Sequence, residues 1–257
     1  MNEAKQKLKR KLIAWCGILI FLGILAFFFW QGILWFNMPS RKHYPVRGVD
    51  VSHYQGDIDW NTIADQGISF AFIKATEGSA SADPQFLTNW CNARAAGITV
   101  GAYHFFSFDS PADTQAQNII RMVPVESDAL PPVIDLEFYR SSQLPDVETV
   151  QENLQIMLDR LSLYYGKTPI IYTTNQCYET YLADTDLEYT LWIRSVFSKP
   201  MGETADRWRF WQYNFRGLLD GYTGDETYID LNLYRGSFAE FKEEFQIAAS
   251  DSMNEPT

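Results

Sequence analysis

The chain has 257 residues, of which 46% are hydrophobic and 16% aromatic, and its formal net charge is −11. This length accommodates one sizeable domain and a short additional segment. The acidic balance excludes nucleic acid as a partner, because phosphate backbones attract basic surfaces. The three cysteines form no Cys-x-x-Cys pair and no zinc-type spacing with histidine, so no metal is expected.

The chain begins with a basic segment followed by an apolar one. Five Lys and Arg residues lie between positions 5 and 11, and Leu12 to Trp30 is a run of nineteen residues without a charge. At ~1.5 Å per residue, a helix of this length spans roughly the ~30 Å hydrocarbon core of a bilayer. The pattern predicts a transmembrane signal anchor that contacts lipid over residues 12–36.

The rival interpretation of this segment is a cleaved signal peptide. Its apolar part would be shorter, ~7 to 15 residues, and would end at small residues, whereas Trp35 and Phe36 follow here. The positive-inside rule puts the basic segment in the cytoplasm and the rest of the chain in the periplasm or outside the cell. Five of the 21 basic and one of the 32 acidic residues precede position 37, so the exported part carries −15.

The predicted organisation has five parts. They are a cytoplasmic segment over 1–11, the anchor over 12–36, a linker over 37–45, a folded domain over 46–245 and a flexible tail over 246–257. The nine-residue linker would reach at most ~30 Å when extended. Cys91 and Cys177 are the only cysteines of the exported part, and the sequence leaves open whether they pair.

The exported part alternates short apolar runs with amphipathic stretches, which is typical of strand and helix units around a parallel sheet. Eight strands are predicted, over 48–52, 69–76, 99–106, 132–137, 168–173, 190–195, 208–213 and 228–233. Helices are predicted between them over 59–66, 84–96, 110–122, 145–165 and 177–183. After Thr190 the gaps are short, so we expect an irregular TIM-like β/α barrel whose last helices are reduced.

Carboxylates gather at the ends of the predicted strands. Asp50, Glu77, Asp135, Glu137 and Asp230 all lie at or near carboxyl ends, the face on which barrels of this type build active sites. Several have apolar flanks, where a buried carboxylate costs several kcal/mol unless it is paired or hydrogen-bonded. The positions of these acids therefore predict an active site at the carboxyl ends of the strands.

The pair Asp135 and Glu137 is the most specific signal. At spacing i, i+2 on a strand, their side chains share one face, while Leu136 points to the other. Two adjacent carboxylates in a partly dry place do not both ionise easily, so one keeps its proton to higher pH, as a general acid requires.

These residues belong to a series of motifs that resembles the glycoside hydrolase family 25 muramidases, a class of lysozyme. The motifs cover nearly all of residues 46–240 and comprise Arg47 to Trp60, Phe72 to Gly78, Gly101 to Phe105, the Asp135-Leu136-Glu137 run, Trp192-Ile193, Phe210 to Tyr213 and Ile229 to Asn232. The resemblance implies a β/α barrel that cuts peptidoglycan glycan strands without a cofactor. No protein partner is implied.

The resemblance also implies roles for particular residues. Glu137 would be the general acid, and Asp135 would orient the substrate's 2-acetamido group while its carbonyl oxygen attacks the anomeric carbon. Asp50 and Asp230 match the family's other acidic positions and would support the acid and position the sugar, or serve structurally as hydrogen-bonding groups at the barrel end.

Further substrate contacts are expected from one acid and several aromatic rings. Glu77 either contacts the sugar or caps a loop, and either Tyr103 or its neighbour His104 points into the barrel, with the histidine expected to be a hydrogen-bonded core residue. Tyr172, Trp192 and Trp211 are candidates to offer flat faces to sugar rings.

One segment departs from the family pattern. After Trp192-Ile193 the chain reads Arg194-Ser195-Val196-Phe197, and Arg194 would either salt-bridge Asp230 or meet a peptide carboxylate of the substrate. Two alternatives to a membrane-anchored muramidase stay open at this point. One is a chitin-type N-acetylglucosaminidase, which shares the Asp-x-Glu chemistry, and the other is a non-catalytic tether that binds peptidoglycan.

Overall fold

The computed structural model describes residues 2–35, 37–139 and 144–247. The chain divides into two compact units, one that ends at Phe36 and one that begins at Asn37. Phe36 itself and most of the predicted tail, from residue 248 on, lie outside the described residues. Cys91 is exposed, Cys177 is buried and both are free thiols, so the two do not form a disulfide.

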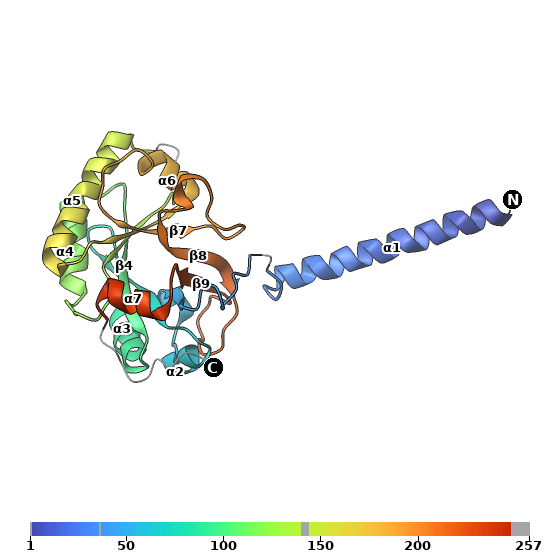
Figure 1. The fold of residues 1–257 in the computed structure, drawn as a ribbon, viewed down its shortest axis with the longest axis horizontal. Coiled ribbons are helices and arrows are strands. Elements are labelled where there is room, and N and C mark those ends of the chain that lie inside the picture. The colour runs from blue at the N-terminus through green and yellow to red at the C-terminus, as the bar shows by residue number, and fades with distance from the viewer. Residues whose placement is uncertain (1, 36, 140–143, 248–257) are drawn as a thin grey trace. The chain divides into compact units, whose positions relative to one another are not determined.

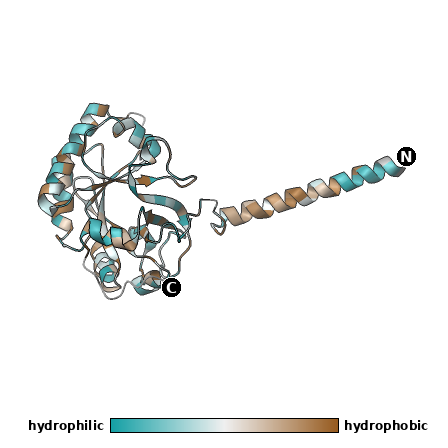
Figure 2. Cartoon of the chain, in the orientation of Figure 1, coloured by the Kyte–Doolittle hydropathy of each residue, from teal (hydrophilic) through white to brown (hydrophobic). Residues whose placement is uncertain are grey.

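The first unit consists of helix α1 (Asn2–Trp30). Its first turns are hydrophilic and the remainder is hydrophobic (Figure 2). The stretch from Lys5 to Trp30 has 26 residues, and its most apolar 18-residue window has a mean hydropathy of 2.7 and is not buried against protein. By length and composition, α1 is able to cross a membrane.

The second unit is a closed barrel. Its eight strands are β1 (Arg47–Val51), β2 (Phe70–Glu77), β4 (Thr99–Phe105), β5 (Val133–Leu136), β6 (Ile170–Thr174), β7 (Thr190–Arg194), β8 (Trp208–Gly217) and β9 (Ile229–Tyr234). They follow the order β1-β9-β8-β7-β6-β5-β4-β2, and pairing of β1 with β2 closes the ring. β9 runs antiparallel to both neighbours, and the short β3 (Ser81–Ala82) forms a hairpin with β2. The predicted barrel and all eight predicted strands are confirmed; β3 was not predicted.

Helices cover the outside of the barrel (Figure 1). They are α2 (Trp60–Asp65), α3 (Phe86–Ala95), α4 (Ala112–Met122), α5 (Val147–Tyr165) and α6 (Asn175–Tyr181), with short 3-10 turns η1 (His53–Gln55) and η2 (Gly202–Thr204). These five helices match the predicted ones, and Gly166 ends α5 in the left-handed conformation with φ 66°. Between β7 and β9 the single turn η2 is the one helical element of the described chain, which agrees with the predicted reduction of the last helices.

The last helix, α7 (Phe238–Phe245), was not predicted. Its sequence signal is the capping box in which Ser237 accepts from the Glu240 amide and Glu240 reaches back to the Ser237 amide. Phe241 and Phe245 of α7 pack against Phe70 and Phe210 at the amino-terminal end of the barrel. The helix therefore plugs the end of the barrel opposite the predicted site.

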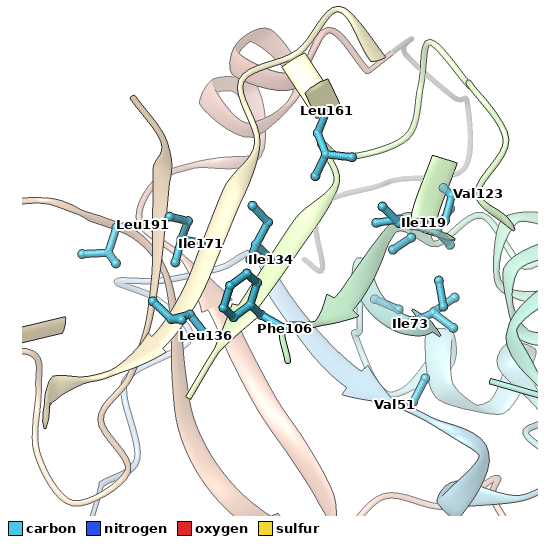
Figure 3. Packing of buried hydrophobic residues seen from close by; sticks show 14 of the residues in the cluster. Val51, Ile73, Phe106, Ile119, Val123, Ile134, Leu136, Leu161, Ile171 and Leu191 are labelled. Carbon is cyan, nitrogen blue, oxygen red and sulfur yellow. The ribbon is translucent and has the colours of Figure 1, made fainter. Parts of the chain in front are cut away.

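The core has two layers because strand side chains alternate between faces. The outer layer lies between sheet and helices, where Ile73, Ile134 and Ile171 meet helix residues such as Ile119 and Leu161 (Figure 3). The inner layer fills the barrel with large rings. Its aromatic members are Phe70, Phe72, Tyr172, Trp192, Phe210, Tyr234, Phe241 and Phe245.

Two glycines make room for these rings. A Cβ atom on Gly48 would come within 2.3 Å of the Phe70 ring, and one on Gly101 within 2.7 Å of the Phe72 ring. Both glycines face the barrel interior, so their missing side chains provide the space that two phenyl groups occupy.

Residues 37–45 form part of the second unit rather than a free linker. The Asn37 amide donates to the carbonyls of Ser195 (3.0 Å) and Tyr213 (3.2 Å), and the Pro39 carbonyl accepts from the guanidinium of buried Arg47. Tyr44 lies against Trp208 and Trp211 on the outer side of β8. The segment thus covers part of the barrel wall that the reduced helices leave open. Because it packs on that wall, it does not act as a flexible tether.

Candidate active site

A cavity of about 560 Å³ opens at the carboxyl ends of the barrel strands. Inward-facing residues at the strand ends and the loops that follow them form its walls. Its charged lining residues are Asp50, Lys74, Asp135, Glu137, Arg194, Arg216, Glu226 and Asp230. The four acids predicted from strand ends therefore converge on one cavity, as the common face of the strands requires.

These four acids form two pairs on facing walls. Asp50 on β1 and Asp230 on β9 are cross-strand partners, while Asp135 on β5 and Glu137 just after it form the second pair. In the closed ring, β5 lies four strands from β9, so the pairs face each other across the barrel mouth. A sugar ring bound between them would be contacted by acids from both sides.

Side-chain amides hold Asp50 in place. Its Oδ2 accepts hydrogen bonds from Asn232 Nδ2 at 2.7 Å and from Gln212 Nε2 at 3.0 Å. Both amides are fixed in turn, because Trp192 Nε1 donates to Asn232 Oδ1 and the Tyr172 hydroxyl donates to Gln212 Oε1. With their oxygens occupied, the two amides present N–H groups to Asp50, which favours its ionised form.

Asp230 complements this arrangement by holding a proton. Burial raises the pKa of Asp230 well above its usual range, and the neighbouring charge of Asp50 raises it further. Burial also raises the pKa of Asp50, but its hydrogen bonds with Asn232, Gln212 and Asp230 oppose this shift. Of the two carboxyls, Asp230 is therefore the one that keeps a proton to higher pH.

The facing pair, Asp135 and Glu137, has fewer hydrogen-bond partners among the described residues. Asp135 is 7% exposed, and its Oδ1 is buried without a hydrogen-bond partner. Burial, followed by the charge of Glu137, raises the pKa of Asp135 well above its usual range. Burial raises the pKa of Glu137 as well, while the positive charge of Arg194 lowers it. Glu137 is only partly buried, so it is open to a ligand.

The predicted aromatic contacts divide into two groups. Tyr103, Tyr172 and Trp192 line the cavity. Trp211 does not: its Nε1 donates to the Ser195 carbonyl at 2.8 Å, and its ring packs on Trp208. Because Gln212 faces the interior, the adjacent Trp211 faces outward, and this corrects the expectation that it contacts sugar.

Glu77 and His104 also lie away from the cavity lining. Glu77 pairs with Lys74 at 2.7 Å, so it reaches the site only through that lysine, which does line the cavity. His104 is buried on the outer face, where its ring nitrogens bond Thr76 Oγ1 and Gln115 Oε1. Burial lowers the pKa of His104 to about 4, so it is a neutral core residue, as expected.

The barrel is also the part of the chain that matches known proteins. The model of the family named Glycosyl hydrolases family 25 matches residues 49–222. The chain belongs to this family. A solved family 25 glycosyl hydrolase from Bacillus anthracis is 48% identical and superposes with a TM-score of 0.75 over 80% of this chain and 95% of that one.

Two further proteins are similar to this chain in sequence. Lysozyme M1 of Streptomyces globisporus is 34% identical over 209 residues, which cover 76% of this chain and 69% of that protein. The protein YegX of Escherichia coli K12 is 34% identical over 223 residues, 85% of this chain and 80% of that one. The chain is thus a glycoside hydrolase of the lysozyme type.

Several residues of the family 25 site were not singled out as site residues from the sequence. Lys74, Gln212 and Asn232 lie within the motifs described above. They stand two positions after the inward-facing residues Phe72, Phe210 and Asp230, so their side chains face inward as well. Arg194 lines the cavity, but among the described residues it lies within 4 Å of no carboxylate, so the expected salt bridge with Asp230 is not formed. Over the described ranges, no three His, Cys, Asp or Glu side chains are grouped to hold a metal.

Proposed function

We propose that this protein is a muramidase that hydrolyses the β-1,4 bond between N-acetylmuramic acid and N-acetylglucosamine in peptidoglycan. The observation that carries the proposal is the pair on β5. Asp135 presents a buried oxygen without a partner, and Glu137 lies beside it with a raised pKa and access to the cavity. Substrate-assisted cleavage requires an acceptor oxygen, which Asp135 offers whether or not its carboxyl is protonated, and a carboxyl able to donate a proton, a role that the raised pKa of Glu137 suits.

The proposed reaction has two steps. Glu137 donates its proton to the glycosidic oxygen while the acetamido carbonyl oxygen attacks the anomeric carbon, and Asp135 accepts the acetamido N–H on its unpartnered oxygen. The leaving sugar departs as an alcohol and a cyclic oxazolinium ion remains. Water then attacks the same carbon and gives a proton to the Glu137 carboxylate, while the bond from that carbon to the oxazolinium ring oxygen breaks and restores the acetamido group. The acid is regenerated, and the anomeric configuration is retained.

The facing wall would position the sugar. The amides of Asn232 and Gln212 hold Asp50, and its cross-strand partner Asp230 has a raised pKa, so the direction of Asp50 is set before substrate binds. Tyr172 and Trp192 fix those amides. These two aromatic residues would therefore both support this wall and contact the sugar.

The identity of the new reducing end tests the proposed bond. Full-length protein in detergent is incubated with purified peptidoglycan, and the soluble products are reduced with borohydride and analysed by mass spectrometry. We expect muropeptides that end in reduced N-acetylmuramic acid. Ends of reduced N-acetylglucosamine would make the enzyme a glucosaminidase, and the absence of soluble products would contradict catalysis.

We also propose that α1 anchors the enzyme in a membrane with residues 1–11 in the cytoplasm and the barrel outside. The support is the uncharged run of nineteen residues in α1, Leu12 to Trp30, which five basic residues precede. In bacterial cells that express the full chain, carbonate washing should leave the protein in the membrane fraction. Protease added to spheroplasts should remove the barrel but protect an epitope at the N-terminus, whereas a soluble, shortened product would indicate a cleaved signal peptide.

A further inference from the structure

Arg194 stands out among the cations of the active-site cavity. It ends β7, faces inward like Trp192 two residues earlier, and lines the cavity. In the ring, β7 lies midway between β9 and β5, which places Arg194 between the two acid pairs. In the described part of the chain its guanidinium makes no hydrogen bond and no ion pair; its contact is the Phe215 ring, 5.5 Å from Cζ to centroid.

The other cations of this cavity have partners of their own. Lys74 pairs with Glu77 at 2.7 Å, and it lies on β2, on the opposite side of the ring from β7. Arg216 donates to the Tyr228 hydroxyl at 2.7 Å and stacks on that ring at 4.3 Å. Arg194 is therefore the described cavity cation whose donors remain available to a ligand.

The physical chemistry of guanidinium indicates the kind of ligand. A partly buried guanidinium without a partner has lost part of its hydration, and an anion with two coplanar oxygens restores its hydrogen bonds in bidentate geometry. The Phe215 ring supports one face of the group, which leaves its edge for such an anion. The acids among the described residues stay more than 4 Å away, so none of them forms an ion pair with Arg194.

We propose that Arg194 binds a carboxylate carried by a muramoyl residue of the glycan, and so makes the enzyme prefer anionic over neutral glycan. This inference rests on the proposed muramidase function. Two carboxylates have the required chemistry: the lactyl carboxylate on O3 of a muramic acid that has lost its peptide, and a carboxylate of an attached stem peptide.

Binding measurements test the subsite without turnover. In the full-length Glu137→Gln protein, affinity is measured for three ligands: peptide-free glycan oligosaccharide, the same oligosaccharide with its carboxyls converted to methylamides, and peptide-bearing oligosaccharide. Each is repeated after a second substitution, Arg194→Gln or Arg194→Lys. Arg160→Gln is the matched control, since it removes the same charge from a half-exposed position on α5.

Each pattern of results decides the matter. If Arg194 binds the lactyl group, Arg194→Gln weakens the peptide-free ligand about 10- to 100-fold, as expected for loss of a charge-assisted hydrogen-bonded pair, and leaves the methylamide unchanged. A loss confined to the peptide-bearing ligand assigns the stem-peptide carboxylate. Arg194→Lys should recover part of the affinity because it restores the charge without the bidentate geometry.

An equal loss for charged and methylamide ligands would overturn the proposal and limit Arg194 to acting on the catalytic acids. In that case the pH profile of kcat in the single Arg194→Gln variant would shift without any change in ligand preference. Wild-type product analysis on the same glycans tests the muramidase reaction separately, because a failure to generate N-acetylmuramic acid ends would contradict that function irrespective of the binding pattern.

Discussion

Replacing Glu137 with Gln is expected to lower kcat on peptidoglycan by about 100- to 10,000-fold, the range that a general acid contributes. Glutamine keeps the size of the side chain but has no acidic proton for the leaving oxygen. The rate is measured as reducing ends released by full-length protein under saturating substrate. KM should change much less than kcat, because the lost interaction belongs to the transition state.

Two controls separate chemistry from folding. Glu152→Gln makes the same change at an exposed position of α5 and should leave the rate unchanged. The Glu137→Gln protein should melt at or above the wild-type temperature, because burial disfavours the charged form of Glu137 and glutamine carries no charge. A variant that melts normally and retains more than about a tenth of wild-type activity would remove Glu137 from the role of general acid.

The pH profile offers an independent readout of the same group. Burial raises the pKa of Glu137 above its ordinary value of 4.5, so the proton needed for catalysis persists at higher pH than in water. Arg194 opposes that shift. The alkaline limb of the wild-type profile should therefore lie above pH 4.5, and loss of the Arg194 charge should move it further upward.

Replacing Asp50 with Leu is expected to lower the free energy of unfolding by about 2–5 kcal/mol. Leucine has a similar size but no acceptor, so Asn232 Nδ2 and Gln212 Nε2 would both lose their partner inside the barrel mouth. Each buried donor without an acceptor costs about 1–3 kcal/mol. Thermal unfolding should show a decrease in Tm on the order of 5 to 15 °C.

Asp230→Asn is the matched control for this result. Because Asp230 keeps a proton to higher pH than Asp50, an asparagine amide at this position donates to Asp50 much as the protonated carboxyl does. Its stability near pH 5 should therefore stay close to that of the wild type. A large destabilisation by Asp230→Asn, together with a mild effect of Asp50→Leu, would reverse the assignment of proton and acceptor within the pair.

Repeating these unfolding measurements across pH shows whether the free energy of unfolding rises or falls as the buried acids release their protons. Folding raises the pKa values of Asp135 and Asp230 above the ordinary 3.8, so the folded state holds protons that the unfolded state releases. Their stabilising contribution is complete below about pH 3.8 and declines as pH rises through the folded values, by at most about 1.4 kcal/mol per pH unit for each group. Asp230→Asn removes one such group, so its stability should fall less steeply with pH than that of the wild type.

Much of this fold follows from local sequence pattern. Each strand of the barrel is an apolar run bounded by turn residues, and helix ends such as Gly166 and the capping residue Asp146 are local signals. Alternation along a strand is also local, so the shared face of Asp135 and Glu137 and the opposite faces of Tyr103 and His104 could be derived from the chain alone.

Alternation does not say which face is the interior. Both faces of a barrel strand are apolar, because one meets the helices and the other fills the barrel, so the phase of Trp211 could not be read from its neighbours. The short helix α7 was missed for a related reason: eight residues give little periodicity, and only its packing on Phe70 and Phe210 gives it a role.

The sequence by itself determined the apolar first helix, the order of the strands and helices and the acids at the strand ends, because propensity and periodicity act between near neighbours. Only the tertiary structure decided the site. Asp50 meets Asn232 182 positions later because β1 closes the ring against β9, and the same closure sets two acid pairs face to face. It also places Arg194 between them, where it contacts the Phe215 ring but pairs with no acid of the described residues. Such contacts depend on the closed geometry of the whole barrel, which no short segment encodes.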